Sequence, residues 1–420
     1  MGNDFKQFAV AGSMLAGAAA LDAMQKNNDE LRIGLIGCGG RGTGAASQAL
    51  KADSNVRLTA MGDAFEDRLQ SSLKTLKNYE ALAAKIDVPA ERQFVGLDAY
   101  QKVLQHSDVV LLCTPPGFRP QHLKAAIDAG KHVFAEKPVA VDGPGIRSVL
   151  ESCKKAQEKN LGVLSGLCLR FHYGFQEIIK RVHDGAIGDL KVLQANDLRT
   201  GRWARTRQPE WTDLQYQMRN WYNFTWLSGD FNVEQHVHFL DVCAWLMNGQ
   251  YPTAATGVGG RQVLTGKEHG NIYDHFSIVY EYADGAKMFS NTRQQPGCKN
   301  ELSASAIGTK GMAFLSERTD GIYLTNPERW VYQGKENNIY QTEHDEFFMS
   351  IRAGKPFNNG EYMAKSTLLA IMGRMAAYTG QRITWEMALN SKESLVPDQL
   401  DWKMKLPDPP IAIPGITKFQ

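Results

Sequence analysis

The chain has 420 residues, with 47 lysines and arginines against 45 aspartates and glutamates, so its formal net charge is only +2. At about 150 residues per domain, this length predicts two or three domains. The content of 43% hydrophobic and 10% aromatic residues excludes an intrinsically disordered chain. The near-neutral charge excludes the basic excess of a typical nucleic-acid-binding protein. No run reaches the roughly 20 apolar residues that a membrane-spanning helix needs.

The six cysteines are scattered along the chain without a CxxC pair. Such spacing argues against a zinc ribbon and against a disulfide-stapled scaffold. We therefore expect reduced, buried thiols.

Residues 1–30 differ from the rest of the chain. Lys6 precedes an apolar stretch from Phe8 to Leu21, near whose end lie the small residues 18–20. This order resembles an export signal with a signal-peptidase site, but only one positive charge precedes the apolar core and there is no twin-arginine pair. Two interpretations stay open: an exported, periplasmic protein, or a cytoplasmic enzyme with an N-terminal extension.

Short apolar strands alternate with helices from residue 31 to residue 160. The sequence predicts strands at 31–36, 55–61, 108–113 and 131–135, and helices at 43–50, 121–129 and 144–159. This alternation indicates a parallel, doubly wound α/β sheet, that is, a Rossmann domain. One more strand is expected at 161–169.

Residues 161–420 are expected to form a second, α+β domain, because strand-like runs now follow one another without long helices between most of them. The runs lie at 191–198, 275–282, 287–293, 302–307 and 321–324, and 283–285 is a hairpin turn signal. They predict an antiparallel sheet. Helices are expected at about 233–247, 341–353 and 362–379, and the proline-rich tail from Leu406 should run extended over the surface.

A glycine-rich turn, Gly37-Cys38-Gly39-Gly40-Arg41-Gly42, joins the first expected strand to the first helix. In a GxGxxG motif the first glycine permits the turn, the second lets the backbone approach a pyrophosphate, and the third allows close helix packing. Asp63 ends the second strand, where a carboxylate can bind the adenosine ribose hydroxyls and would repel a 2′-phosphate. The pattern predicts NAD rather than NADP. The alternatives are a purely structural turn and a helix-capping Asp63.

Three further motifs follow: Thr114-Pro115-Pro116, Ala129-Gly130-Lys131-His132-Val133 and Glu136-Lys137-Pro138. In this order after a dinucleotide motif, they resemble the glucose–fructose oxidoreductase / inositol dehydrogenase family, whose hallmark is Glu-Lys-Pro. The resemblance covers the chain from residue 31 and includes the 185–188 turn and the 229–248 helix. It implies a Rossmann domain, an open, mainly antiparallel α+β domain, an active site between them, and a homodimer or homotetramer.

The resemblance also implies individual roles. Lys137 would lie beside the substrate hydroxyl, where an ammonium stabilises a developing alkoxide. Aligned on a histidine and the following Asp241, His238 takes the place of the catalytic base, and Glu234 stands where relatives carry aspartate. Independently, residues i and i+4 share one helical face, and an imidazole pKa of about 6.5 suits proton removal near neutral pH. The expected cofactor-binding residues are Gly37, Gly39, Gly40, Arg41, Gly42, Asp63, Thr114, Pro115, Pro116, His122, Glu136 and Lys137.

The segment from Arg199 to Trp226 holds four of the eight tryptophans, interleaved with arginines. Aromatic faces stack on sugar rings and guanidinium groups bind hydroxyls or carboxylates, so we interpret the segment as the wall or lid of a carbohydrate pocket. The alternative is an arm packed in an interface or in the interior. The expected substrate-binding residues are Arg170, His172, Tyr173, Trp221, Tyr222 and His236.

No metal site is predicted. The two histidines at 236 and 238 would point about 200° apart on a helix and could not share one ion. On a strand they could, but the apolar rhythm of the surrounding residues favours a helix.

These residues predict an enzyme that oxidises a secondary hydroxyl of a sugar, glycoside or cyclitol by reversible hydride transfer to NAD. The alternative, implied by some members of the family, is glycoside hydrolysis, in which a tightly bound NAD oxidises the sugar transiently and is regenerated after elimination and water addition. A non-catalytic binding protein is disfavoured because both Lys137 and His238 are present.

Overall fold

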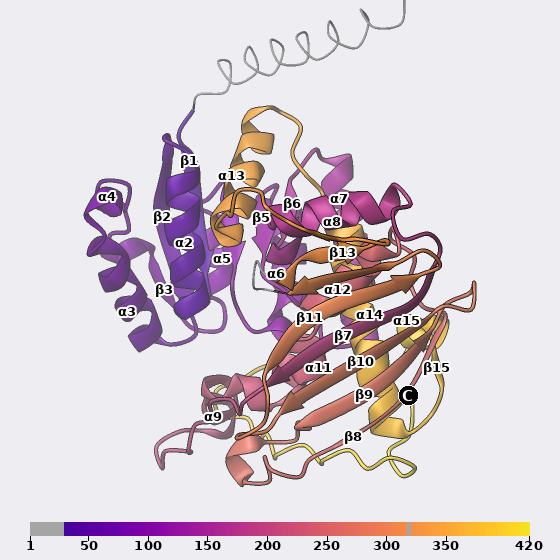
Figure 1. The fold of residues 1–420 in the computed structure, drawn as a ribbon. Helices are drawn as coiled ribbons and strands as arrows, with labels where there is room; N and C mark the ends of the chain where they lie inside the picture. Colours follow the sequence, from indigo (N-terminus) through magenta and orange to yellow (C-terminus); the bar gives the residue numbers. More distant parts are fainter. Residues whose placement is uncertain (1–28, 317–320) are drawn as a thin grey trace, which may run out of the picture.

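The computed structural model describes residues 29–316 and 321–420. Two sheets, each with its own helices, organise these residues (Figure 1). The export signal considered for residues 1–30 falls almost entirely outside the described residues. Within them, no helix is both long enough and apolar enough to cross a membrane.

The first sheet is parallel and six-stranded, in the order β3-β2-β1-β4-β5-β6, which is the strand order of a Rossmann domain. Its strands are β1 (Leu31–Ile36), β2 (Val56–Asp63), β3 (Gln93–Val95), β4 (Val109–Leu112), β5 (His132–Ala135) and β6 (Val163–Ser165). Because β6 pairs with β5, this sheet extends past the boundary expected at residue 160. The strand expected at 161–169 is shorter, since a 3₁₀ turn, η3 (Cys168–Phe171), takes up its second half.

Helices bury both faces of this sheet. They are α2 (Gly40–Ala52), α3 (Glu66–Lys77), α4 (Glu80–Ala83), α5 (Ala99–Leu104), α6 (Arg119–Asp128) and α7 (Gly143–Glu158). Along β4, Val109 and Leu111 pack with α2 and α3, whereas Val110 and Leu112 pack with α5, α6 and α7. A helix from late in the chain, α13 (Ile339–Arg352), joins the α2 side (Figure 1).

The second sheet has nine strands in the order β14-β13-β12-β11-β7-β10-β9-β8-β15. They are β7 (Leu190–Arg199), β8 (Ala254–Gly260), β9 (His275–Glu281), β10 (Lys287–Gln294), β11 (Glu301–Gly308), β12 (Met312–Ser316), β13 (Tyr323–Thr325), β14 (Arg329–Val331) and β15 (Ile383–Thr384). The central pair β7–β10 is parallel and the other pairs are antiparallel. The expected α+β domain with a mainly antiparallel sheet is therefore confirmed, with one parallel pair that the sequence did not predict.

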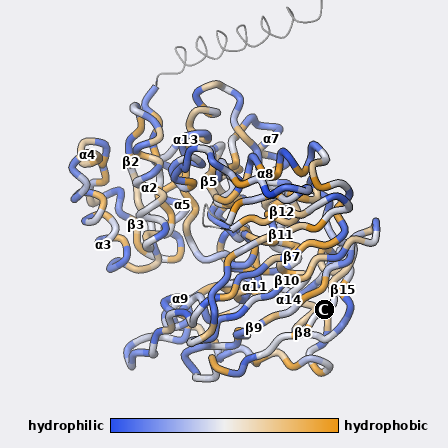
Figure 2. The backbone as a smooth tube through the Cα atoms, in the orientation of Figure 1, coloured by the Kyte–Doolittle hydropathy of each residue, from blue (hydrophilic) through white to orange (hydrophobic). Residues whose placement is uncertain are grey.

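Helices cover one face of the second sheet and fill the space between the domains. They are α8 (Tyr173–His183), α9 (Asp213–Arg219), α10 (Thr225–Ser228), α11 (Phe231–Glu234), α12 (Val237–Leu246), α14 (Gly360–Thr379) and α15 (Trp385–Asn390). The other face carries exposed apolar side chains such as Val258, Phe289 and Ile307. Hydrophobic and hydrophilic residues accordingly mix along these strands (Figure 2).

All six cysteines are unpaired in this structure. Five are buried or half-buried, as expected, whereas Cys298 is exposed. The expectation of burial was wrong for Cys298 because it lies in the surface loop between β10 and β11.

Candidate active site

The glycine-rich turn before α2 leaves room for a ligand. Gly37 has a φ of +95°, which glycine adopts without a steric penalty, and a Cβ on Gly42 would lie 2.0 Å from the Gly37 carbonyl oxygen. In contrast, a Cβ on Gly39 or Gly40 would meet nothing within 4 Å. No side chain caps α2 at Gly39, so the first amides of the helix are available to an anion. The turn therefore fits the pyrophosphate of a dinucleotide.

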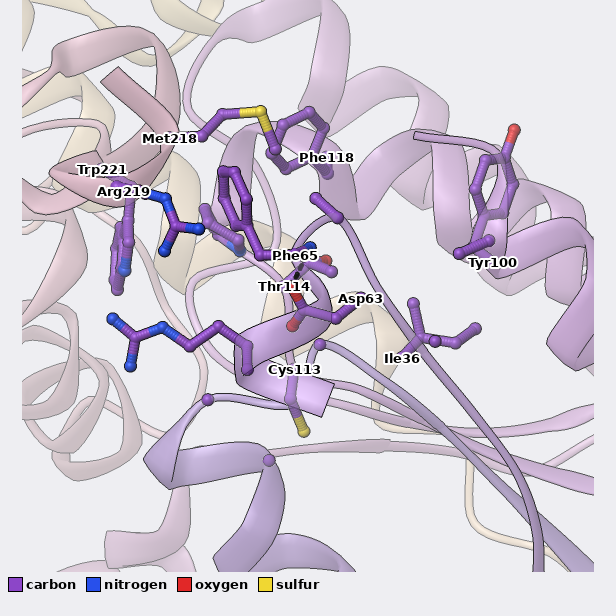
Figure 3. A pocket seen from close by; sticks show the side chains of 18 of the residues that line it. Ile36, Asp63, Phe65, Tyr100, Cys113, Thr114, Phe118, Met218, Arg219 and Trp221 are labelled. Carbon is purple, nitrogen blue, oxygen red and sulfur yellow. Dashed lines mark hydrogen bonds between the residues drawn. The ribbon is translucent and has the colours of Figure 1, made fainter. Parts of the chain in front are cut away.

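A cavity of about 470 Å³ lies over this turn (Figure 3). Most of the predicted cofactor-binding residues line it, namely Gly37, Gly39, Gly40, Arg41, Gly42, Asp63, Thr114, Pro115 and His122. Pro116 is instead buried at the start of a 3₁₀ turn, η2 (Pro116–Phe118). Glu136, which forms a 2.9 Å ion pair with Arg41, and Lys137 lie outside the cavity lining.

Asp63, at the carboxyl end of β2, holds the two loops that border the cavity. Its Oδ2 accepts a 2.7 Å hydrogen bond from the Cys38 amide, and its Oδ1 accepts one of 2.9 Å from the Phe65 amide. Burial raises the pKa of Asp63 above its ordinary value. Each carboxylate oxygen keeps a further lone pair, so ribose hydroxyls can still donate to it. Asp63 therefore combines loop capping with the expected capacity to bind a ribose.

His122 closes the cavity beside Thr114. Its Nδ1 lies 3.2 Å from the Thr114 hydroxyl, and its ring stacks on Tyr100 with centroids 4.3 Å apart. Burial, helped by the positive charge of Arg119, lowers the pKa of His122 to about 3. The imidazole is therefore neutral in the physiological range.

Lys137 follows β5 and reaches across to the second domain. Its Nζ donates a hydrogen bond to the backbone carbonyl of Glu234 and lies 3.3 Å from the carboxylate Oε1 of the same residue. The two side chains are 11% and 7% exposed, so this ion pair is shielded from solvent. The structure thus brings together Lys137 and Glu234, two residues that the resemblance assigns to the catalytic site.

The helix expected over 233–247 is in fact two helices, with a break at Gln235 and His236 between α11 and α12. In a continuous helix the Glu234 carbonyl would accept the His238 amide. Instead the His238 amide donates to the Gln235 carbonyl at 3.3 Å, and the Lys137 ammonium binds the Glu234 carbonyl. Glu234 and His238 therefore lie in two successive helices rather than in the one continuous helix that was expected, and the Lys137 ammonium binds the Glu234 carbonyl at the break.

His238 begins the first turn of α12, and its Nδ1 is buried without a hydrogen-bond partner. Burial, then the positive charges of Lys137 and Arg199, lower the pKa of His238 well below its ordinary value. The imidazole is consequently neutral at physiological pH and carries a free nitrogen, which are the properties of a group that accepts a proton.

Arg202 is a further member of this cluster that the sequence analysis did not select as a site residue. Its side chain is 6% exposed, and its Nη2 lies 3.9 Å from Glu234 Oε2. None of its guanidinium nitrogens has a hydrogen-bond partner, and neither does Glu234 Oε2. Burial lowers the pKa of Arg202 to about 9, so it remains cationic at neutral pH. Buried polar groups are usually hydrogen-bonded, so these free groups are suited to a ligand.

The only sequence feature that pointed to Arg202 as a site residue was its place in the aromatic and basic segment 199–226. Composition alone could not distinguish it from the neighbouring arginines. Tyr222, one of the expected substrate-binding residues, packs its ring under the Arg202 guanidinium and is itself buried. Trp221, another, lines the dinucleotide cavity. The segment therefore does not form a single carbohydrate wall.

Arg170 makes a two-pronged ion pair with Asp241, with both distances 2.8 Å. Its guanidinium also lies 3.9 Å from the ring centroid of Tyr362. These contacts join η3 to α12 and α14, so in this structure Arg170 is engaged in packing between elements rather than turned to an open site.

The other residues expected to bind substrate, His172, Tyr173 and His236, lie in different surroundings. His172 caps α8 by accepting the Gly174 amide at 3.1 Å, and Tyr173 is 37% exposed. His236 is fully buried, and its Nε2 lies 2.8 Å from the Ser290 hydroxyl of β10. The break between α11 and α12 turns His236 toward the sheet. Within residues 29–316 and 321–420 no group of three or more His, Cys, Asp or Glu side chains could hold a metal ion.

Comparisons with known proteins agree with this architecture. Residues 31–164 match the Gfo/Idh/MocA description "oxidoreductase family, NAD-binding Rossmann fold", and residues 175–314 match the C-terminal domain of the same family. The chain is 25% identical over 340 residues to a myo-inositol 2-dehydrogenase of Thermotoga maritima, covering 78% of this chain and 90% of the relative. It is 22% identical over 338 residues to an inositol 2-dehydrogenase of Rhizobium meliloti, covering 77% and 89%.

Among solved structures, scyllo-inositol dehydrogenase of Lactobacillus casei with bound NAD(H) and scyllo-inositol matches with a TM-score of 0.65 at 18% identity. The match covers 85% of this chain and all of that one. At this identity the match shows a shared fold.

Proposed function

Because this chain belongs to the Gfo/Idh/MocA family of NAD-binding oxidoreductases, we propose that it oxidises a secondary hydroxyl of a cyclitol or sugar. NAD, held by the glycine-rich turn and Asp63, would accept the hydride. One observation carries the proposal. At the junction of the two domains the Lys137 ammonium lies beside the Glu234 carboxylate, and its charge acts on the neutral His238. The similarity to inositol dehydrogenases of Thermotoga maritima and Rhizobium meliloti supports a cyclitol substrate.

Each group has a proposed task. His238, neutral and with a free Nδ1, accepts the proton of the substrate hydroxyl. The Lys137 ammonium stabilises the negative charge that develops on the substrate oxygen. Glu234, bound to Lys137, holds that ammonium in place and leaves its Oε2 free for a substrate hydroxyl.

Arg202 is proposed as a substrate-binding residue. Its unpartnered N–H groups can donate to hydroxyl or carboxylate oxygens of the substrate. Tyr222 and Phe231 flank the guanidinium and fix its plane. A bound substrate would then supply the hydrogen-bond partners that the protein itself does not.

The test is a spectrophotometric assay of the purified protein with external NAD and a panel of inositols, aldoses and aryl glycosides. The proposal expects NADH, detected by its nicotinamide absorbance, to form in proportion to the oxidised substrate. Release of an aryl group without net NADH would instead support the hydrolase alternative and contradict net oxidation.

We also propose that the chain forms a homodimer or homotetramer through the outer face of the second sheet. Support comes from the exposed side chains of Val258, Phe289 and Ile307 on β8, β10 and β11, because clustered exposed apolar side chains often mark interfaces. Light scattering would give the mass of the assembly. A Phe289→Glu variant that shifts it to the monomer mass would support this face, and an unchanged mass would count against it.

A further inference from the structure

The dinucleotide cavity has a second wall that comes from the C-terminal domain. The wall consists of side chains from the segment 203–221, namely Trp203, Arg205, Met218, Arg219 and Trp221. Figure 3 shows Met218, Arg219 and Trp221 gathered with Phe65 and Phe118 at one side of the cavity. A nucleotide site made only by a Rossmann domain would lack this wall.

This wall covers the adenosine end of the cavity. Phe65 and Arg68, which line the same cavity, follow Asp63 at the carboxyl end of β2. In a Rossmann domain the pyrophosphate lies on the glycine-rich turn and the ribose on the acidic residue after the second strand. The adenine of a bound dinucleotide would therefore lie beyond Asp63. Trp203 and Trp221 line the same cavity and pack edge to face, with ring centroids 6.3 Å apart.

An ion pair fastens the wall to the Rossmann domain, in addition to apolar packing of Met218 and Trp221 in a cluster that includes Phe65 and Phe118. Both terminal nitrogens of Arg219 donate to the carboxylate of Asp67 in α3, at 3.0 and 2.8 Å. The Arg219 guanidinium also lies 4.0 Å from the ring centroid of Phe65 and 5.4 Å from that of Trp211. Two-pronged pairs of this kind are among the stronger charge-assisted contacts, so Arg219 links α9 to α3 directly above the cavity.

The chemistry of the wall suits a purine nucleoside. Flat aromatic surfaces stack on a base irrespective of its hydrogen-bonding pattern. Arg68 and Arg219 lie close enough to Arg205 that their positive charges lower its pKa, although burial is the larger cause. Three guanidinium groups thus surround the adenosine end, where they can stack on the base or donate to ribose and phosphate oxygens.

We propose that the five wall residues, Trp203, Arg205, Met218, Arg219 and Trp221, form a clamp over the adenosine half of NAD, and that the Asp67–Arg219 pair must open before the dinucleotide leaves. Trp221 then serves the cofactor rather than the substrate, in contrast to the interpretation made from sequence. This inference rests on NAD binding and is independent of which alcohol is oxidised.

The experiment measures NADH dissociation without any substrate. The NADH-loaded full chain is mixed rapidly with excess NAD, and the loss of energy transfer from tryptophan to bound NADH gives the rate. Trp221→Ala should accelerate dissociation by about tenfold to a hundredfold, the usual effect of removing one aromatic stacking partner of a base. Arg219→Ala should accelerate it by about threefold to tenfold, because loss of a contacting ion pair acts mainly on the off-rate.

The matched control is Arg207→Ala. Arg207 lies in the same segment and pairs with Asp213 at 2.7 Å, but it does not line the cavity, so the rate should equal that of the wild type. Arg219→Lys keeps the positive charge but cannot make the two-pronged hydrogen bond to Asp67, so it should give an intermediate rate. This variant shows whether the effect of Arg219→Ala comes from misfolding.

A second measurement locates the clamp along the cofactor. Calorimetric titration of Trp221→Ala should show weakened binding of ADP-ribose, which carries the adenosine half, and unchanged binding of nicotinamide mononucleotide. Unchanged NADH dissociation in Trp221→Ala and Arg219→Ala, or equal losses for both half-ligands, would overturn the proposal. Neither result would bear on the oxidation chemistry, which the assay with alcohols tests separately.

Discussion

The two ends of the site are built in opposite ways. At the dinucleotide end, space is created by residues without side chains, and a Cβ on Gly39 or Gly40 would meet only open cavity. At the reaction centre, space is filled by charged side chains from both domains, such as Lys137, Arg202 and Glu234. The difference teaches that the glycine-rich turn offers a ligand its backbone, whereas the second end depends on a network in which each charge alters the pKa values of its neighbours.

The largest expected effect is at the reaction centre. His238→Ala should lower kcat by about 10²–10⁴-fold, the usual contribution of a general base. NAD affinity should not change, because His238 does not line the dinucleotide cavity. Steady-state kinetics and NAD titration check both parts.

A matched control for His238 is His236→Gln, which changes the imidazole two residues away that is bonded to Ser290. It should lower the melting temperature while the folded enzyme keeps a near-normal kcat. Near-normal turnover in His238→Ala would refute its role as the base.

Lys137→Met should lower kcat by about 10²–10³-fold, the scale of losing one donor to a developing oxyanion. It should also move the pH profile. Because the Lys137 cation is one cause that depresses the pKa of His238, its removal raises that pKa. Protonated His238 cannot accept a proton, so activity is lost as the pH falls through the pKa.

The pH profile of kcat/KM gives the measurement. In the wild type the acid limb should lie well below the ordinary histidine pKa of about 6.5, and in Lys137→Met it should lie at higher pH. An acid limb at the same pH in both proteins would show that Lys137 does not act on His238.

At the dinucleotide end, Asp63→Ala should weaken NAD binding by about tenfold to a hundredfold, as expected when hydrogen bonds to a charged group are lost. NADP binding should weaken far less, because the carboxylate that repels its 2′-phosphate is also removed. Asp63→Asn retains an oxygen that can accept the Cys38 amide, so it separates loss of charge from loosening of the turn. Equal losses for NAD and NADP would contradict the ribose contact.

The smallest effect concerns Glu343 in α13, whose two carboxylate oxygens are buried without partners. Burial, reinforced by Glu136, raises the pKa of Glu343 well above its ordinary value. The folded state therefore binds this proton more tightly than the unfolded state, and stability falls as the pH rises above about 4.5.

The variant Glu343→Gln lacks that titration. Its melting temperature should match the wild type at acid pH and exceed it by about 2–4 °C at neutral pH, equivalent to ~1 kcal/mol of unfolding free energy. A melting difference that does not depend on pH would contradict the protonated state of Glu343.

The comparison of the two ends also explains what could be predicted. The dinucleotide-binding turn can be predicted from sequence, because the strand, the glycines and the helix that form it are adjacent in the chain. The break before His238 cannot, and the Lys137 ammonium that binds the Glu234 carbonyl at this break lies 97 positions earlier. The helical periodicity of residues 233–247 therefore gives no information about the hydrogen bond from Lys137.

Other features that the sequence did not reveal have similar causes. The aromatic content of the segment 199–226 was evident, but composition does not specify that Trp221 lines the dinucleotide cavity. The ion pair between Arg219 and Asp67 joins residues 152 positions apart and links α9 to the Rossmann domain. Strand β8 was missed because Gly257, Gly259 and Gly260 weaken its β-propensity, while pairing with β9 stabilises it.

The hydrogen bond from Lys137 to the Glu234 carbonyl has a consequence for how the enzyme assembles. The donor belongs to the end of a Rossmann strand and the acceptor to the second domain, so neither domain alone can terminate α11 in this way. Lys137 and Glu234 make this contact only when the two domains have docked. Docking of the two domains therefore also completes the proposed active site, and a molecule whose domains have not docked lacks this site.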